Sequence, residues 1–120
     1  MNTKELIELQ SNKLFTIGAH TMTHPFLPNF SFDYQKNEIQ GSVDFLKKLT
    51  GKSVRYLAYP HGGCNQDTLA ILANLPINLA FTTDSQLFDT DTKKHAMPRF
   101  QVKNWNGQKF ALNLNTWLRN

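Results

Sequence analysis

Apolar residues recur at helical spacing in four stretches of the chain, and these stretches predict four helices. The first runs from residue 3 to about residue 10, the second ends near residue 49, and the others follow Asn65 and Asn106. The apolar positions that define them are Leu6 and Leu9; Ile39, Val43, Leu46 and Leu49; Leu69, Leu72 and Leu75; and Phe110, Leu114 and Trp117. The capping residues expected are Thr3, Ser31 or Asp33, Asn65 and Asn106, with Gly51 ending the second helix.

Short apolar runs between these stretches predict strands at 14–18, 54–59 and 78–82, and a further strand at 98–102. Strands that alternate with helices in this way indicate βαβ units and a parallel sheet, so the fold class is α/β. Right-handed crossovers then place the carboxyl ends of all strands on one rim. The loop at 19–31 is too long for a plain connector, which makes it a candidate functional loop.

Two histidines four residues apart, His20 and His24, are the strongest chemical signal in the chain. In a helical turn or tight loop this spacing brings both imidazoles to one side, where they can share a metal ion. They follow the first predicted strand, at the edge of an α/β sheet where ligands collect. Two surface histidines that share a loop without a ligand are the alternative, because a zinc site needs three or four ligands and this pair supplies two.

Other polar residues follow the later strands and should reach the same rim. His61 precedes two glycines, whose backbone can approach a ligand closely, so its turn is either an oxyanion-binding turn or a plain one. Asp84 is either a ligand or base, or a turn former. No base or activating field accompanies Cys64, which favours a packed cysteine. His95 lies in a polar, lysine-containing loop, which favours a solvated histidine.

Composition narrows the function classes. At 120 residues the chain is one domain or part of one, and 40% hydrophobic residues suit a globular protein. The formal net charge is +4, but the lysines are scattered, which argues against a nucleic-acid-binding stripe. No apolar run is long enough for a membrane span, and the first residues show no signal-peptide core. A single cysteine excludes an internal disulfide.

Four sequence segments resemble the NodB-type polysaccharide deacetylases of carbohydrate esterase family 4. His20-Thr-Met-Thr-His24-Pro25 looks like the H-[ST]-x-x-H-P zinc motif of that family. Tyr56-Leu-Ala-Tyr-Pro-His-Gly-Gly63 is similar to its Pro-Tyr-Gly motif in the FAYPYG variant, and the segments at 80–83 and 97–100 resemble later parts of the same subgroup. The resemblance spans about residues 3–102, in the family's order and spacing.

The resemblance implies a distorted (β/α) barrel, similar to a TIM barrel, and a zinc-dependent hydrolase. In that family two histidines and an aspartate bind zinc or a similar divalent ion, which activates water for attack on the acetamide of an acetylated amino-sugar polymer. By this resemblance His20 and His24 are metal ligands. The backbone N–H of His61, where the family usually has tyrosine, is the oxyanion donor.

The chain departs from the family pattern at three places. The Asp-Asp motif, which holds the general base and third ligand, lies upstream of the histidines in the family, and the 19 residues before His20 contain no aspartate. The arginine of the Pro-Tyr-Gly motif is Ala58 here, as in the FAYPYG subgroup. The late Leu-x-x-His motif is not evident, and the surroundings of His95 do not match it.

These departures predict that residues 1–120 form a single, incomplete deacetylase domain that lacks the first strand or strands of the barrel. We expect a weakly active or inactive form of a deacetylase; the alternative is a non-catalytic remnant that binds carbohydrate or a partner. A third alternative makes His61 or Asp84 a replacement ligand. An open sheet edge would invite self-association or a complementing N-terminal fragment. The family is often extracytoplasmic.

Overall fold

The structure is a computed structural model, and it describes residues 2–119. In chain order its elements are α1 (Thr3–Ser11), η1 (Leu27–Asn29), α2 (Phe32–Thr50), β1 (Tyr56–Ala58), η2 (Pro60–Gly62), α3 (Gln66–Ala73), β2 (Leu79–Phe81) and α4 (Gly107–Trp117). The four predicted helices are therefore all present. η1 and η2 are single turns of 3-10 helix inside predicted loops.

Side-chain caps fix the starts of the helices, as the sequence predicted for three of them. Ser31 accepts a hydrogen bond from Tyr34 N, and Asn106 accepts one from Lys109 N. Asn65 exchanges hydrogen bonds with Thr68 in a reciprocal capping box. At the C-terminal end of α2, Gly51 adopts the predicted left-handed conformation.

The prediction of Thr3 as the cap of α1 is wrong by one residue. The side chain of Asn2 accepts from Glu5 N, and the carboxylate of Glu5 accepts in return from Asn2 N. Only Asn2 has an acidic partner three residues later, since Leu6 occupies that position relative to Thr3. The reciprocal pair therefore selects Asn2.

The sheet is parallel, as predicted, and its two strands are short. β1 pairs with β2 in a register that places Leu57 opposite Ala80. One isolated bridge extends the sheet on each side: Ala19 pairs with Leu57, and Met97 pairs with Phe81. Four chain segments thus lie side by side, and each continues into a loop at the same rim.

The predicted strands at 14–18 and 98–102 are not formed. In a parallel register with Ala19 opposite Leu57, residues 14–17 would need partners at 52–55, where the chain is the loop leaving α2. Leu14 is accordingly 87% exposed. At the other edge, pairing reaches Met97 and stops, because the next donor of the ladder, Arg99 N, bonds Asp84 O instead of Thr82 O.

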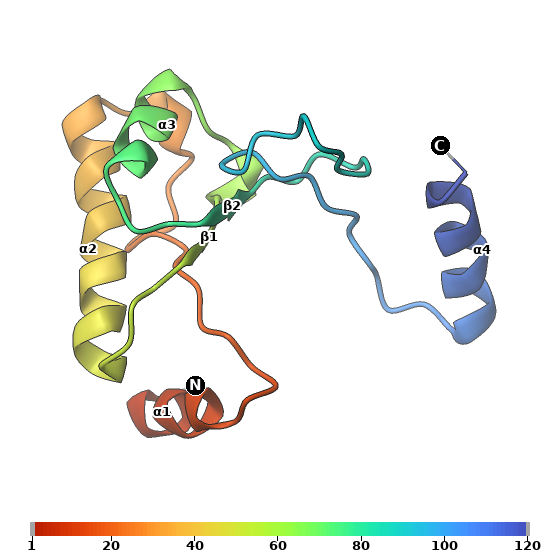
Figure 1. Ribbon diagram of the computed structural model, residues 1–120, viewed down its shortest axis with the longest axis horizontal. Coiled ribbons are helices and arrows are strands. Elements are labelled where there is room, and N and C mark those ends of the chain that lie inside the picture. The colour runs from red at the N-terminus through yellow and green to blue at the C-terminus, as the bar shows by residue number, and fades with distance from the viewer. Residues whose placement is uncertain (1, 120) are drawn as a thin grey trace.

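α2 and α3 pack side by side and cover one face of the sheet (Figure 1). The core lies between these two helices and the strands, where Leu57, Leu72, Ile39 and Ala80 are fully buried. Along β1 and β2 burial alternates: the central residue of each strand is buried and its neighbours are half-exposed. Side chains alternate between faces, so the half-exposed set belongs to the opposite face.

That opposite face is open. It forms a hollow of about 460 Å³ lined mainly by small and apolar side chains, including Ala19, Tyr56, Ala58 and Phe81. Parallel sheets are ordinarily covered on both faces, because their crossover helices lie there. The sheet of this chain is therefore a half-covered one.

The two terminal helices contribute little to the core. α1 touches α2, and none of its residues is buried. α4 stands apart from the other elements at the end of an extended segment, and it also has no buried residue (Figure 1). It packs on that segment instead, where Trp117 stacks on Phe100 at a centroid distance of 4.5 Å. No helix within residues 2–119 combines the length and hydrophobicity needed to cross a membrane.

Candidate metal centre

The segments that follow Ala19, β1 and β2 meet at one rim, as the topology predicted. The imidazole rings of His20 and His24 lie edge to face, with centroids 4.8 Å apart. The ring of His61 lies at the same centroid distance from His24. The turn that carries His61 touches the end of β2, where the Thr83 hydroxyl faces the His61 carbonyl at 3.4 Å.

His20 is oriented by its own backbone environment. Its Nδ1 lies 2.7 Å from the carbonyl oxygen of Ala58, the last residue of β1. A carbonyl can only accept a hydrogen bond, so Nδ1 carries the proton and donates it. The lone pair of the neutral ring is then on Nε2, as in metal-ligating histidines that donate their other nitrogen to the backbone.

The histidine loop, residues 20–24, has an unusual backbone. Thr21 and His24 have φ values of 63° and 61°, in the left-handed region. A non-glycine residue pays about 1 kcal/mol or more for this conformation. Part of the compensation is local, because His24 N donates to Thr21 Oγ1 at 3.2 Å. Among residues 2–119 the only other non-glycine residue with positive φ is His61, at 55°. All three therefore lie in the candidate site.

The remaining compensation comes from Glu38, which sequence reasoning missed. This residue of α2 is only 7% exposed, and its carboxylate accepts hydrogen bonds from Met22 N, Thr23 N and Thr23 Oγ1. The available signal was an acidic residue directly before Ile39, one of the apolar positions that mark the inner face of the helix. A buried carboxylate requires partners, so this position pointed to a polar contact.

The turn after β1 is tightly constrained by its neighbours. Gly62 N donates to Tyr59 O and Gly63 N donates to Pro60 O. A Cβ on Gly62 would overlap Thr83, and a Cβ on Gly63 would overlap the ring of Phe26. The His61 N–H has no acceptor among residues 2–119. The turn thus leaves one amide free beside the histidine pair.

Two of the other candidates, His95 and Cys64, have hydrogen-bond or packing partners in the fold. His95 is half-buried rather than solvated as predicted: its Nε2 lies 2.9 Å from Ile77 O, and its carbonyl accepts from the Tyr59 hydroxyl. Cys64 packs against the core, and burial, with a smaller contribution from the charge of Asp84, raises the pKa of its thiol. A thiol with a raised pKa is a poor nucleophile at neutral pH, which agrees with the predicted packed cysteine.

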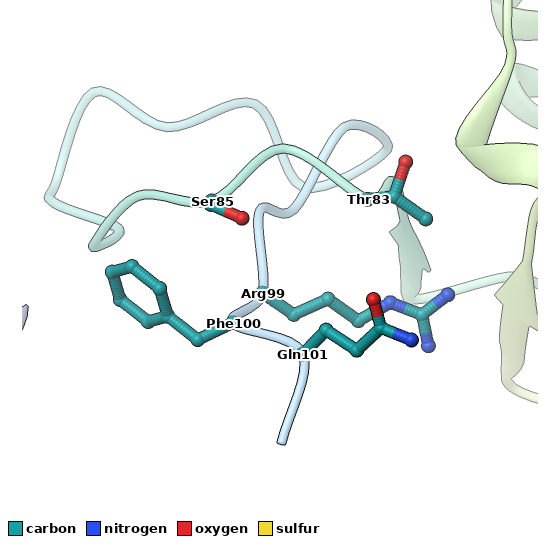
Figure 2. A pocket seen from close by; sticks show the side chains of 5 residues that line it. All are labelled: Thr83, Ser85, Arg99, Phe100 and Gln101. Atoms are coloured by element: carbon teal, nitrogen blue, oxygen red, sulfur yellow. The ribbon is translucent and has the colours of Figure 1, made fainter. Parts of the chain in front are cut away.

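Asp84 and Arg99 build the neighbouring part of the rim. Asp84 Oδ2 accepts from the Thr82 hydroxyl at 2.9 Å. Arg99 Nε donates to Thr82 O, and Arg99 N donates to Asp84 O. Figure 2 shows a pocket of about 360 Å³ here, with the Arg99 side chain extended toward Thr83 and with Ser85, Phe100 and Gln101 around it. This pocket adjoins the His61 turn through Thr83 and was not predicted from the sequence.

The donor set fits a divalent ion only in part. His20 and His24 provide two adjacent imidazoles, a ligand type that zinc accepts. Within the described part of the chain, no group of three or more His, Cys, Asp or Glu side chains is arranged to hold a metal ion. The geometry therefore gives no support to His61 or Asp84 as a replacement third ligand.

The sequence and the structure of the chain are both similar to those of known proteins. The family profile "Polysaccharide deacetylase" matches residues 1–80. The Streptococcus pyogenes deacetylase PplD, solved in complex with acetate, is 26% identical, with a TM-score of 0.86 over 94% of this chain and 50% of PplD. A polysaccharide deacetylase from Bacillus cereus is 25% identical, with a TM-score of 0.83 over 95% of this chain and 36% of that protein. None of the curated proteins compared with the chain matches it significantly.

A more distant relative shares the fold. A de-N-acetylase from Aggregatibacter actinomycetemcomitans is 12% identical, with a TM-score of 0.77 over 94% of this chain and 52% of its own. The chain thus spans 36–52% of these three solved proteins. Its α/β fold corresponds to part of their barrel, which confirms the predicted partial barrel of the NodB type.

Proposed function

Because the chain belongs to the polysaccharide deacetylase family, we propose that it contributes to a domain that hydrolyses N-acetyl groups on an amino-sugar polymer. The observation that carries the proposal is the pair of imidazoles at the sheet rim, 4.8 Å apart, beside the free N–H of His61. Proteins of this family act on acetylated polysaccharides. Amide hydrolysis needs a polarised carbonyl, an activated water and an oxyanion site, and the rim offers groups for the first and the last.

The proposed cofactor is zinc or a similar divalent ion, with His20 and His24 as two of its ligands. When bound, such an ion acts as a Lewis acid on the acetamide carbonyl and lowers the pKa of water. The Ala58 carbonyl keeps the His20 proton on Nδ1 and leaves Nε2 as the donor atom. The folded loop holds His24 beside it, so that both rings are positioned before a ligand arrives.

His61 is the proposed oxyanion donor, through its backbone N–H. This role does not depend on the side chain, so a histidine can stand where the family usually has tyrosine. Because Gly62 and Gly63 have no Cβ, the turn lies close against Thr83 and Phe26, which confine it. A donor fixed in this way needs no reorganisation when negative charge develops on the acetamide oxygen. The adjoining pocket with Arg99 and Gln101 offers hydrogen-bond donors for sugar hydroxyl groups.

No carboxylate among the described residues joins the histidine pair in a three-ligand group, so we propose that the chain alone is weakly active or inactive. Two imidazoles alone hold zinc weakly, because the described residues form no three-ligand group, and we expect the family's general base to be missing as well. A complementing polypeptide segment would supply both functions. The open face of the sheet, with Tyr56 and Phe81 half-exposed, is the surface that we assign to such a segment.

The second candidate is a non-catalytic remnant that binds carbohydrate or a partner protein. It is favoured by one observation, the absence of a three-ligand group among residues 2–119. Metal analysis of the purified chain separates the two candidates. Zinc that is bound stoichiometrically and lost in His24→Ala supports the metal site, whereas no binding at saturating zinc supports the remnant.

The catalytic proposal is tested by acetate release from N-acetylated chito-oligosaccharides in the presence of zinc or cobalt. We compare the chain alone with a chimera in which it replaces the corresponding half of the S. pyogenes deacetylase. We expect turnover by the chimera only, lost in His20→Ala and kept in His95→Gln, because His95 lies away from the pair. A folded, zinc-loaded chimera without turnover would refute deacetylation. Turnover by the chain alone that His20→Ala abolishes would refute its inactivity.

A further inference from the structure

One buried carboxylate holds the backbone of the histidine loop. Glu38 lies in the second turn of α2, facing the sheet rim, and it is 7% exposed. Its Oε2 accepts from Met22 N at 2.9 Å and from Thr23 N at 2.8 Å. Its Oε1 accepts from the Thr23 hydroxyl at 2.8 Å. Met22 and Thr23 lie between His20 and His24, so the carboxylate binds the middle of the histidine loop.

Burying this carboxylate is costly unless several donors satisfy it. An acidic side chain is rarely this buried without partners, and here the partners are two amides and a hydroxyl from one loop. Hydrogen bonds to an ionised acceptor are about twice as strong as those between neutral groups. The same helix face also buries Ile39 and Val43, which pack in the core, and the polar residues Gln35 and Ser42, which bond Phe30 O and Ile39 O. The Glu38 carboxylate accepts hydrogen bonds from the histidine loop.

The three hydrogen bonds oppose the strain of the loop. Thr21 and His24, at φ values of 63° and 61°, flank the two residues that Glu38 holds. Without the carboxylate, Met22 N and Thr23 N would turn toward water. Thr21 and His24 could then relax to ordinary backbone conformations, which would reorient the imidazole of His24 relative to that of His20.

We therefore infer that Glu38 is a positioning residue that sets the mutual orientation of His20 and His24 for metal binding. The inference rests on the proposed metal site and goes beyond it, because it assigns a role to a residue outside the motif. Outer-shell groups of this kind contribute about 10–100-fold to metal affinity.

Substitutions at Glu38 separate positioning from simple packing. Glu38→Gln keeps all three contacts: its amide oxygen can accept from Met22 N and Thr23 N, and its NH₂ can donate to the Thr23 hydroxyl oxygen. Glu38→Ala removes them. The matched control is Gln35→Ala, one turn earlier on α2, where the buried amide bonds Phe30 O and the Thr68 hydroxyl and does not touch the histidine loop.

The experiment measures zinc affinity of the full chain by calorimetry, and the nuclear Overhauser effect between the His20 and His24 ring protons without metal. For Glu38→Ala we expect an affinity at least about 10-fold lower and loss of the ring contact. For Glu38→Gln we expect the ring contact to persist and the affinity to stay within about 3-fold, below the outer-shell range. Gln35→Ala should lower the melting temperature and leave both readouts unchanged.

Unchanged affinity and an intact ring contact in Glu38→Ala would overturn the inference. If the wild-type chain binds no zinc, the proposed metal site fails, and the ring contact still decides the role of Glu38. If Glu38→Ala does not fold, Thr23→Val removes one of the three contacts from the loop side. It should weaken the ring contact, and an undiminished contact in that variant would also overturn the inference.

Discussion

The sheet region, residues 19–99, and the terminal helices α1 and α4 differ in burial. The helices of both regions have side-chain caps and amphipathic sequences, but only the sheet region forms a core. All the buried hydrophobic residues that form the core of the described chain lie between Ala19 and Ala80. α1 and α4 have side-chain caps and amphipathic sequences of the same quality, and neither buries a residue. Local signals thus suffice to start and stop a helix, whereas burial requires a partner surface.

The comparison explains where apolar surface is left exposed. Ile7 on α1 and Leu112 on α4 face outward, although their helices carry the pattern of core-facing helices. In the solved relatives this chain corresponds to 36–52% of the protein. The terminal helices and the open face of the sheet thus all expose apolar side chains. We extend the proposal of a complementing segment from the sheet to these two helices.

The largest expected effect comes from matched leucine truncations in the two regions. Leu72→Ala, at a fully buried position of α3, should lower the free energy of unfolding by about 3 kcal/mol, because it leaves a cavity. Leu112→Ala, at a position 66% exposed on α4, should change it by less than about 0.5 kcal/mol. Urea unfolding of both variants measures the difference. Equal losses would show that α4 belongs to the same packed unit.

Glycine substitutions give the next largest contrast. Gly62→Ala places a methyl group against Thr83 at a φ of 75°, and should cost about 2 kcal/mol or more. Gly107→Ala, where a Cβ meets open space, should stabilise α4 by about 0.5 kcal/mol. Thermal unfolding provides the measurement. A neutral Gly62→Ala would mean that the turn after β1 is less confined than described.

The helix caps should differ in how far their effects reach. Asn65→Ala should lower global stability by about 1–2 kcal/mol, because Thr68, its capping partner, is buried and bonded to Gln35. Asn106→Ala should cost about 1 kcal/mol to α4 alone. Amide hydrogen exchange distinguishes the two results. Faster exchange in the sheet region of Asn106→Ala would contradict the separation of the regions.

The smallest expected effect concerns Cys64. Burial first, and the charge of Asp84 second, raise the pKa of its thiol, so the thiolate is scarcer at pH 8 than in an unfolded chain. Alkylation by iodoacetamide at pH 8 should be slower in the native protein than in urea, and Asp84→Asn should speed the native reaction modestly. The neutral thiol contributes stability below the ordinary cysteine pKa, and this is lost as pH rises through the folded value. Equal alkylation rates with and without urea would contradict a buried thiol.

The helices and the parallel pair of strands were predictable from sequence because their signals are local. Ser31, Asn65, Asn106 and Gly51 act within one helical turn of their own positions. The strands at 14–18 and 98–102 were wrong predictions, because a strand also needs a neighbour in register. Whether a neighbour lies alongside residue 14 depends on a pairing at Ala19 that no local pattern encodes.

The site was predictable to the extent that its residues form motifs. His20, His24 and His61 stand in short segments that follow strands, and the structure brings them together. Glu38 and Arg99 escaped prediction because their partners, Thr23 and Thr82, lie 15 and 17 residues away in sequence. The left-handed backbone of Thr21 and His24 is likewise a consequence of three-dimensional contacts.

The most direct test of the account is a zinc titration of the full chain, followed through the ring resonances of its four histidines. If the strand-end pair is a metal site, the His20 and His24 resonances should change together with a common affinity, while His95 remains unchanged. Saturating zinc that leaves both His20 and His24 unperturbed, or that acts first on His95, would contradict the central claim that the rim of this sheet is a metal centre.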